Sequence, residues 1–153
     1  MTMTSVGKQI VQFLLASGGT DISLTFPNGV VRGMSAQELV GALSGSTGGS
    51  QTPRCYIVMS QDAFVDDDSQ FANADWIASL NSATKQTTGN YCNISFDVTN
   101  DTSEDINYKQ IGKLIYEWRD DAGGAIIDKF PCDITIPAGT TKTVQFTYDV
   151  SQM

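Results

Sequence analysis

The pattern of apolar and polar positions predicts a short helix near the start of the chain. Within residues 6–16, Ile10, Phe13 and Leu14 stand at helical spacing, and Val6 lies one turn earlier. Ser5 is placed to begin this helix, and two glycines follow its end. Because Ile10 is followed by another β-branched residue, a strand remains the alternative in this segment.

A β-hairpin and a second helix are predicted next. Residues 22–26 alternate apolar and polar side chains, and the Pro-Asn-Gly sequence at 27–29 favours a turn. Residues 30–32 then return as a second strand. The Ser-Ala-Gln-Glu sequence at 35–38 matches a capping box, in which serine and glutamate satisfy free backbone amides at a helix start. The helix that follows is predicted to end at Gly45.

Strand patterns dominate the rest of the chain. Residues 55–59 form a short apolar run between Pro53 and Ser60, which predicts a buried strand, whereas residues 75–80 are predicted to form a helical turn. From Tyr91 onward, short alternating segments separated by turns are typical of an antiparallel β-sandwich. These strands are predicted at 91–99, 111–119, 125–127, 133–136 and 144–150, with a polar loop at 100–107.

These patterns divide the chain into two folded parts. Residues 1–44 are predicted to form a small α+β module, and residues 53–153 a β-sandwich domain. Residues 45–52 are rich in Gly, Ser and Thr, as flexible linkers are. A module of 44 residues is too small to fold alone, so it must dock on another protein, on a copy of itself, or on the domain across the linker.

Composition argues against several classes of function. The 153 residues include 9 Lys and Arg, 17 Asp and Glu and no His, which gives a net charge of −8. Phosphate backbones and anionic membranes are therefore not expected partners. Without histidine, Ser–His–Asp and Cys–His catalysis are impossible within one chain. No enzymatic activity, cofactor, metal ion or small-molecule substrate is expected.

The cysteines and the first apolar segment give no clear sign of a disulfide framework, a membrane span or a signal peptide. Cys55, Cys92 and Cys132 are an odd number at wide spacing, which favours free, buried thiols. A Cys92–Cys132 disulfide is the alternative. The apolar stretch at 10–16 is too short for a membrane span and lacks the basic start of a signal peptide, so it is predicted to pack or dock.

Two acidic groups are candidates for chemistry. Asp62 and the run at 66–68 suggest a calcium loop, but the spacing does not match an EF-hand, and a solvated acidic loop is favoured. Asp120 and Asp121 suggest paired carboxylates for glycosidic chemistry, but they precede Ala-Gly-Gly, so a turn is favoured.

Aromatic residues are the other candidates. Trp76, Tyr91, Tyr116 and Trp118 suggest a platform on which a sugar would stack. Tyr116 and Trp118 share a predicted inner face with Leu114, which favours a core role and leaves Trp76 as the exposed aromatic. Two glycosylation sequences, which begin at Asn93 and Asn100, carry little weight without a signal peptide.

The second half of the chain resembles immunoglobulin-like β-sandwiches of bacterial and phage surface proteins. Three segments carry the resemblance: NISFDVTN at 93–100, GKLIYEW at 112–118 and ITIPAGTTKTVQF at 134–146. The paired cysteines of antibody domains are missing. The whole layout resembles accessory virion proteins of tailed phages, such as head decoration and fibre proteins. That resemblance implies a mainly β fold, a structural role, and a virion location after synthesis in the host cytoplasm.

The resulting hypothesis is a capsid-attached, homo-oligomeric virion protein whose leading module contacts other capsid or tail proteins. The alternative is a surface-exposed module that binds a glycan or a protein through the loops at 100–107 and 120–124. Trp76, Asp120 and Asp121 are candidates for surface binding. The predicted assembly contacts are Ile10, Phe13, Leu14, Ile22, Leu24, Phe26, Leu39 and Leu43.

Overall fold

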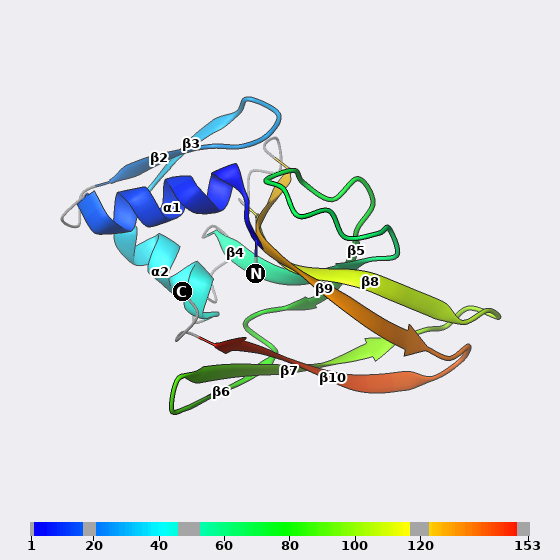
Figure 1. Ribbon diagram of the computed structural model, residues 1–153. Coiled ribbons are helices and arrows are strands. Elements are labelled where there is room, and N and C mark those ends of the chain that lie inside the picture. The colour runs from blue at the N-terminus through cyan, green and yellow to red at the C-terminus, as the bar shows by residue number, and fades with distance from the viewer. Residues whose placement is uncertain (1, 17–20, 46–52, 117–122, 150–153) are drawn as a thin grey trace.

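The computed structural model describes residues 2–16, 21–45, 53–116 and 123–149, which form two antiparallel sheets, a separate β-hairpin and two helices (Figure 1). Strands account for 53% of the structure and helices for 16%, which confirms the predicted mainly β class. The elements are β1 (Thr2–Met3), α1 (Ser5–Ala16), β2 (Ile22–Thr25), β3 (Val31–Met34), α2 (Ala36–Ser44), β4 (Arg54–Ser60), β5 (Asp75–Ser79), β6 (Thr84–Thr88), β7 (Tyr91–Thr99), β8 (Ile106–Tyr116), β9 (Gly124–Ile136) and β10 (Thr141–Asp149).

The two sheets pack face to face as a sandwich. One has the strand order β1-β9-β8-β4-β5 and the other the order β10-β7-β6 (Figure 1). Alternation in each strand turns one set of apolar side chains toward the other sheet. Ile57 and Ile115 of the first sheet therefore share one buried cluster with Ile94 and Val144 of the second.

The strand order differs from that of immunoglobulin domains. Counted from β4, the first, second, fifth and sixth strands lie in one sheet, and the third, fourth and seventh lie in the other. In a constant-type immunoglobulin domain the fourth strand joins the first, second and fifth, and the sixth joins the third and seventh. The resemblance therefore extends to the antiparallel sandwich and not to its connectivity.

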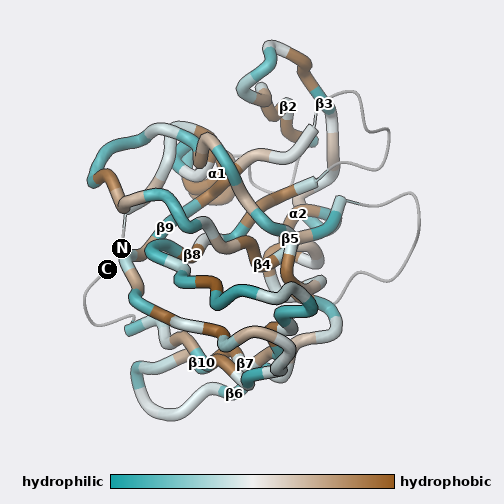
Figure 2. The backbone as a smooth tube through the Cα atoms, turned by 90° about the vertical axis from the view of Figure 1, so that its right-hand side faces the viewer, coloured by the Kyte–Doolittle hydropathy of each residue, from teal (hydrophilic) through white to brown (hydrophobic). Residues whose placement is uncertain are grey.

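The leading part of the chain is joined to this sandwich. β1 pairs with β9, where Met3 lies opposite Asp128. The predicted first helix is confirmed as α1, but Thr4 rather than Ser5 caps it, because the Gly7 amide donates to Thr4 Oγ1 at 3.2 Å. Figures 1 and 2 both place α1 between the hairpin and the sandwich.

The predicted hairpin and second helix are confirmed. β2 and β3 pair antiparallel across a turn in which Gly29 adopts φ 87°. Ser35 caps α2, since its Oγ accepts from the Glu38 amide at 3.1 Å. The Glu38 carboxylate in turn accepts from the Ser35 hydroxyl. Gly45 ends the helix with φ 71°, as predicted.

Both parts of the chain contribute to one core. Val6 of α1 and Leu24 of β2 belong to the same cluster as Ile57 of β4 and Ile127 of β9. The boundary predicted at residues 45–52 therefore does not separate two hydrophobic cores, and all of it except Gly45 lies outside the described residues. Of the three partners predicted for the leading module, the structure shows the domain across the linker.

This packing corrects most of the predicted assembly contacts. Side chains buried inside their own chain are not available to another molecule. Five of the predicted contacts are buried in this way, each 0–3% exposed: Ile10, Ile22, Leu24, Phe26 and Leu39. Phe13 and Leu43 are partly buried against the core, and Leu14 remains 40% exposed.

Several strand predictions were wrong in detail. Residues 75–79 form strand β5 rather than a helical turn, because they pair with β4 at the sheet edge. β8 begins at Ile106, which shortens the predicted loop at 100–107. The strands predicted at 125–127 and 133–136 are parts of the single strand β9.

Candidate functional site

Two charged residues are buried side by side in β9. Asp128 is 6% exposed and Lys129 is 1% exposed. Because successive side chains of a strand point to opposite faces, Asp128 faces the second sheet and Lys129 faces the outer side. Buried charges are costly unless they are paired, so each marks a place where the structure supplies a specific environment.

Asp128 lies in a polar group at the inner face of the sandwich. Tyr148 of β10 donates a hydrogen bond from its hydroxyl to Asp128 Oδ2 at 2.8 Å. Lys113 of β8 is the register partner of Asp128, and its Nζ lies 4.8 Å from the centre of the Tyr148 ring. Among the described residues, Asp128 Oδ1 has no hydrogen-bond partner of regular geometry.

This environment shifts two pKa values. Burial raises the pKa of Asp128, while the Lys113 ammonium, the Tyr148 hydroxyl and the Lys113 backbone amide act in the opposite direction. Burial, followed by the Asp128 charge, raises the pKa of Tyr148 well above its usual range. Tyr148 therefore stays a hydrogen-bond donor, and Asp128 is held closer to its neutral form than an exposed aspartate.

A cavity of about 290 Å³ opens beside this group. Ile10, Val11 and Leu14 of α1 and Leu43 of α2 form an apolar wall. The polar side of the cavity is formed by the three residues described above: Lys113, Asp128 and Tyr148. The cavity therefore combines an apolar wall with a small polar end, as small-molecule sites do.

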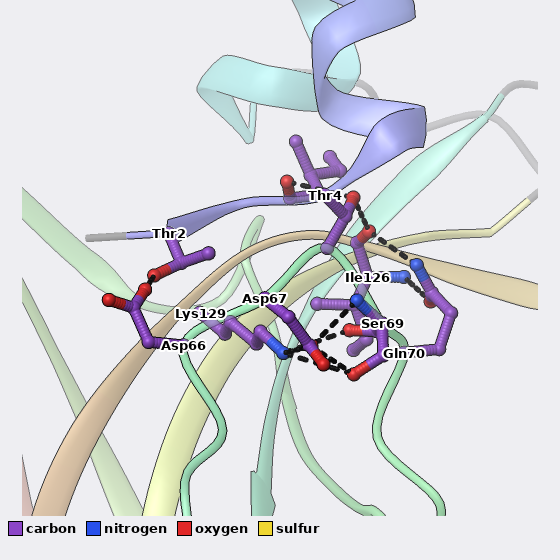
Figure 3. Close-up of polar contacts among 9 residues, drawn as sticks. Thr2, Thr4, Asp66, Asp67, Ser69, Gln70, Ile126 and Lys129 are labelled. Atoms are coloured by element: carbon purple, nitrogen blue, oxygen red, sulfur yellow. Dashed lines mark hydrogen bonds and ion pairs between the residues drawn. The ribbon is translucent and has the colours of Figure 1, made fainter.

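On the opposite face of β9, Lys129 fastens the acidic loop to the sheet (Figure 3). Its ammonium donates to Asp67 Oδ1 at 3.1 Å and to the Ser69 carbonyl at 3.0 Å. Hydrogen bonds from Ser69, followed by the one from Lys129, lower the pKa of Asp67 to about 2. Asp67 therefore remains ionised at neutral pH and binds the buried lysine.

Further contacts hold the same loop against the sheet. Gln70 donates to the Ile126 carbonyl at 3.0 Å, and the Thr2 hydroxyl donates to the Asp66 carboxylate (Figure 3). Within the part of the chain that the structure describes, no group of acidic or cysteine side chains is arranged to hold a metal ion. For the loop at 62–68, a solvated acidic loop was favoured over a calcium loop, and all four of its aspartates are exposed. Its contacts with Lys129 and Thr2 also hold it over β9 and β1.

Trp76 lies in an aromatic cluster on the outer face of the five-stranded sheet. It is 48% exposed, and its ring centre lies 5.0 Å from that of Tyr56 and 5.4 Å from that of Tyr116. The interplanar angles of 41° and 76° show that the rings are inclined to one another. Tyr91 lies on β7 of the other sheet and is not part of the cluster.

The face predicted for Tyr116 and Leu114 is corrected. Leu114 packs in a small cluster with Val58 and Ile126. Tyr116 and Phe71, which follows the acidic loop, also pack against this cluster. This is the outer face of the sheet, because Ile115, the alternate residue, belongs to the large core. Trp118, Asp120 and Asp121, the other candidates for surface binding or stacking, lie outside the described residues.

The predicted assembly contacts leave one exposed apolar surface. Leu14 is 40% exposed, and its neighbours Val11 and Leu15 are 39% and 83% exposed. These three residues are called the α1 surface below. Sequence reasoning missed Val11 and Leu15, although their 11-14-15 spacing places them with Leu14 on one helix face.

The cysteines and the buried Asn100 offer no accessible disulfide or glycosylation site. Cys55, Cys92 and Cys132 are free, so the alternative Cys92–Cys132 disulfide is not formed. Asn100 is 1% exposed, which makes its glycosylation sequence inaccessible in the folded chain. Neither described helix has the length and apolarity needed to cross a bilayer.

Comparison with known proteins gives no assignment: no protein-family model, curated protein or solved structure matches the chain.

Asp128 and Lys129 are the buried site residues that sequence reasoning missed. The signal that marks them is a pair of charges between the apolar residues Ile127 and Phe130, within a segment that reads as a strand.

Proposed function

We propose that the chain is a non-enzymatic structural component of a larger particle, specifically a capsid-attached decoration or fibre protein of a phage virion. The observation that carries the structural role is the α1 surface. Val11, Leu14 and Leu15 lie exposed on a helix whose other side is buried through Val6 and Ile10. The virion assignment rests on the resemblance of the sequence to accessory phage proteins.

The α1 surface is suited to docking because the start of α1 is attached to the sandwich. Thr4 fixes the start of α1, as its amide donates to the Ile127 carbonyl at 3.0 Å. The helix thus presents its apolar residues on a base attached to β9. Burying a large aliphatic side chain against a partner contributes about 1.5–3 kcal/mol. In this proposal, contacts form through the outer side of α1 rather than through the whole leading module.

Replacing Leu15 by aspartate is expected to abolish self-association without unfolding the chain. Leu15 is 83% exposed, so a charge there costs the monomer little but opposes burial in an interface. Sedimentation velocity over a concentration series should show an oligomer for the wild type and a monomer for Leu15→Asp. The matched control is Val40→Asp on α2, where Val40 is 50% exposed, and it should assemble normally.

Two results would contradict the proposal. If the wild-type chain stays monomeric at every concentration, homo-oligomerisation through α1 is excluded. Mass spectrometry of virions purified from the source culture tests the location directly. If purified particles lack the chain while the surrounding lysate contains it, the virion role is rejected.

The aromatic cluster supports a second candidate function, the binding of a glycan or a protein surface. Trp76 is half exposed on the edge strand β5, and its ring contacts those of Tyr56 and Tyr116 on the same face of the sheet. Exposed tryptophans held by other aromatic rings are common at the centres of binding sites. The cluster is a separate surface from α1, so both functions can coexist in one chain.

Replacing Trp76 by alanine is expected to weaken such binding about tenfold or more, as the loss of an interface anchor does. A glycan array probed with the wild-type chain identifies the ligand, and titration calorimetry measures the variant. Tyr91→Ala is the matched control, since Tyr91 is 50% exposed on the other sheet. Equal affinities of wild type and Trp76→Ala would exclude this surface.

A further inference from the structure

One buried amide on the outer face of the five-stranded sheet lacks a hydrogen-bond partner. Six polar or charged residues of the described chain are buried, and five of them form side-chain hydrogen bonds: Thr4, Ser60, Asn100, Asp128 and Lys129. The sixth is Gln110 of β8, which is 4% exposed and whose amide bonds to no described residue. Native structures rarely leave a buried amide unpaired, so Gln110 requires a partner from outside the described chain.

The Gln110 amide faces a cavity of about 210 Å³ between the sheet and the loop at 62–72. Its nitrogen and oxygen are not enclosed, whereas Asp128 Oδ1 is, so a molecule in this cavity can reach the amide. Five residues of the loop that line the cavity are exposed, which opens it to solvent: Asp62, Ala63, Val65, Ser69 and Ala72.

The charged groups around the cavity favour a neutral ligand. The Lys129 ammonium donates to Asp67 Oδ1, to the Ser69 carbonyl and to the Ser69 hydroxyl, so each of its three N–H groups has an acceptor (Figure 3). Its charge is therefore already paired. Asp62 places a carboxylate at the rim, and the chain carries a net charge of −8, so an anion is repelled. A cation in turn would approach the buried Lys129 ammonium.

The polar groups that remain are matched by hydroxyl groups. The Gln110 amide presents donor N–H groups beside an acceptor oxygen, and two neighbouring hydroxyl groups satisfy both, because each hydroxyl donates and accepts. Asp62 Oδ2 accepts from Asn73 at 3.1 Å, which leaves Oδ1 without a partner in the described chain and able to accept from a third hydroxyl. A single amide group would also pair with Gln110, but it would leave Asp62 and most of the cavity unused.

The rest of the wall is apolar and limits the size of the ligand. Ala63, Val65, Phe71 and Ala72 line it, and the C–H groups of a sugar ring suit such a surface. The volume of about 210 Å³ lies below the usual range of ligand pockets, so one ring fits and an oligosaccharide does not. We propose that this cavity binds a single neutral sugar residue, whose neighbouring hydroxyl groups pair with the Gln110 amide and with Asp62.

Sugar binding in this cavity is independent of both proposed functions. Neither Leu15 nor Trp76 lines the cavity, so Leu15→Asp and Trp76→Ala should leave sugar binding here unchanged. Gln110→Met should conversely leave assembly through α1 and binding at Trp76 unchanged. Failure of this site is thus distinguishable from failure of either proposed function.

Nuclear magnetic resonance of the isotope-labelled full chain tests the ligand. Glucose, galactose and mannose are titrated separately, with acetamide and acetate as comparison probes. We expect at least one sugar to bind with a Kd on the order of 1 mM and to shift the signals of the Gln110 side-chain amide and of the loop at 62–72. Acetamide and acetate should bind at least tenfold more weakly.

Methyl glycosides of the sugar that binds distinguish a free monosaccharide from the end of a glycan. A methyl glycoside that binds as tightly as the free sugar indicates the terminal residue of a glycan. Loss of binding on methylation indicates a free monosaccharide. Both results support a site for one neutral sugar residue.

Variants assign the roles of the two polar residues. Gln110→Met should weaken sugar binding at least tenfold without lowering the urea midpoint of unfolding, because an apolar side chain of similar shape replaces an unpaired amide. Asp62→Ala removes an exposed acceptor and should weaken binding about fivefold in a chain that still folds. Asp68→Ala is the matched control, since Asp68 is exposed on the same loop and does not line the cavity.

Four results would overturn the proposal. Absence of binding by all three sugars would leave water as the partner of Gln110. Acetamide that binds as tightly as the best sugar would show a site for a single amide group. Sugar binding that survives Gln110→Met would place the ligand elsewhere. If Gln110→Met lowers the urea midpoint, Asp62→Ala decides, and an unchanged sugar affinity in that variant rejects the site.

Discussion

Replacing Gly7 by alanine is expected to lower the free energy of unfolding by about 2 kcal/mol or more. In isolation the change favours a helix by about 1 kcal/mol, because alanine is the better helix former. In α1 the added Cβ would overlap the Ile127 carbonyl oxygen and would lie 2.7 Å from Met3 Cγ. The Ile127 oxygen belongs to the backbone of β9, which is paired with strands on both sides and cannot move away easily. Steric overlap therefore outweighs helix propensity.

Urea denaturation followed by circular dichroism measures the effect. Gly33→Ala is the control, because a Cβ at Gly33 has only the Ile22 carbonyl oxygen nearby, at 3.9 Å. Its free energy of unfolding should stay within about 0.5 kcal/mol of the wild type. If Gly7→Ala proves as stable as the wild type, α1 does not lie this close to β9, and the shared core described above would have to be revised.

Local signals in the sequence predicted local structure well. The helix start at Ser35 and the helix end at Gly45 depend only on residues within one or two turns of each other, and the structure has both. The second contact of the predicted capping box differs: the glutamate was expected to accept from a backbone amide, whereas the Glu38 carboxylate accepts from the Ser35 hydroxyl. The hairpin turn at Gly29 is equally local, since its positive φ suits glycine. These features need no information from the rest of the chain.

Elements that depend on distant partners were predicted less well. β5 has no clear alternation, and its extended form follows from pairing with β4. β6 was missed because all five of its residues are exposed, which leaves no apolar pattern to detect. β9 was divided in two because Pro131 interrupts the pattern. The register between β8 and β9 shifts near Pro131, as is usual where a sheet accommodates proline.

The docking of α1 on β9 had no sequence signal of its own. Its buried positions, Val6 and Ile10, are consistent with any apolar partner, and the sequence does not say which surface covers them. For the same reason Asp128 and Lys129 were overlooked: charges are usually exposed, and their burial results from the tyrosine, the acidic loop and the helix that surround β9.

Replacing Asn100 by alanine is expected to destabilise the chain by about 3 kcal/mol, an effect comparable to that at Gly7. Asn100 is 1% exposed, and its amide donates to the carbonyls of Glu104 at 2.8 Å and Ile136 at 2.9 Å. Its Oδ1 accepts from the amide of Thr102 at 3.0 Å. Alanine would leave these groups without their partner, at about 1–3 kcal/mol for each that remains buried.

Asn93 provides the matched control, because it begins the other glycosylation sequence. It lies within β7, whereas Asn100 directly follows that strand. Its Oδ1 accepts one hydrogen bond, from the Thr147 hydroxyl at 2.7 Å, at a solvent-exposed position. Water replaces such a bond readily, so Asn93→Ala should change the free energy of unfolding by about 0.5 kcal/mol or less. Equal losses in the two variants would mean that Asn100 does not hold the turn between β7 and β8 against β9. A large loss at Asn100 alone would show that this asparagine is a buried structural residue, which its sequence motif does not reveal.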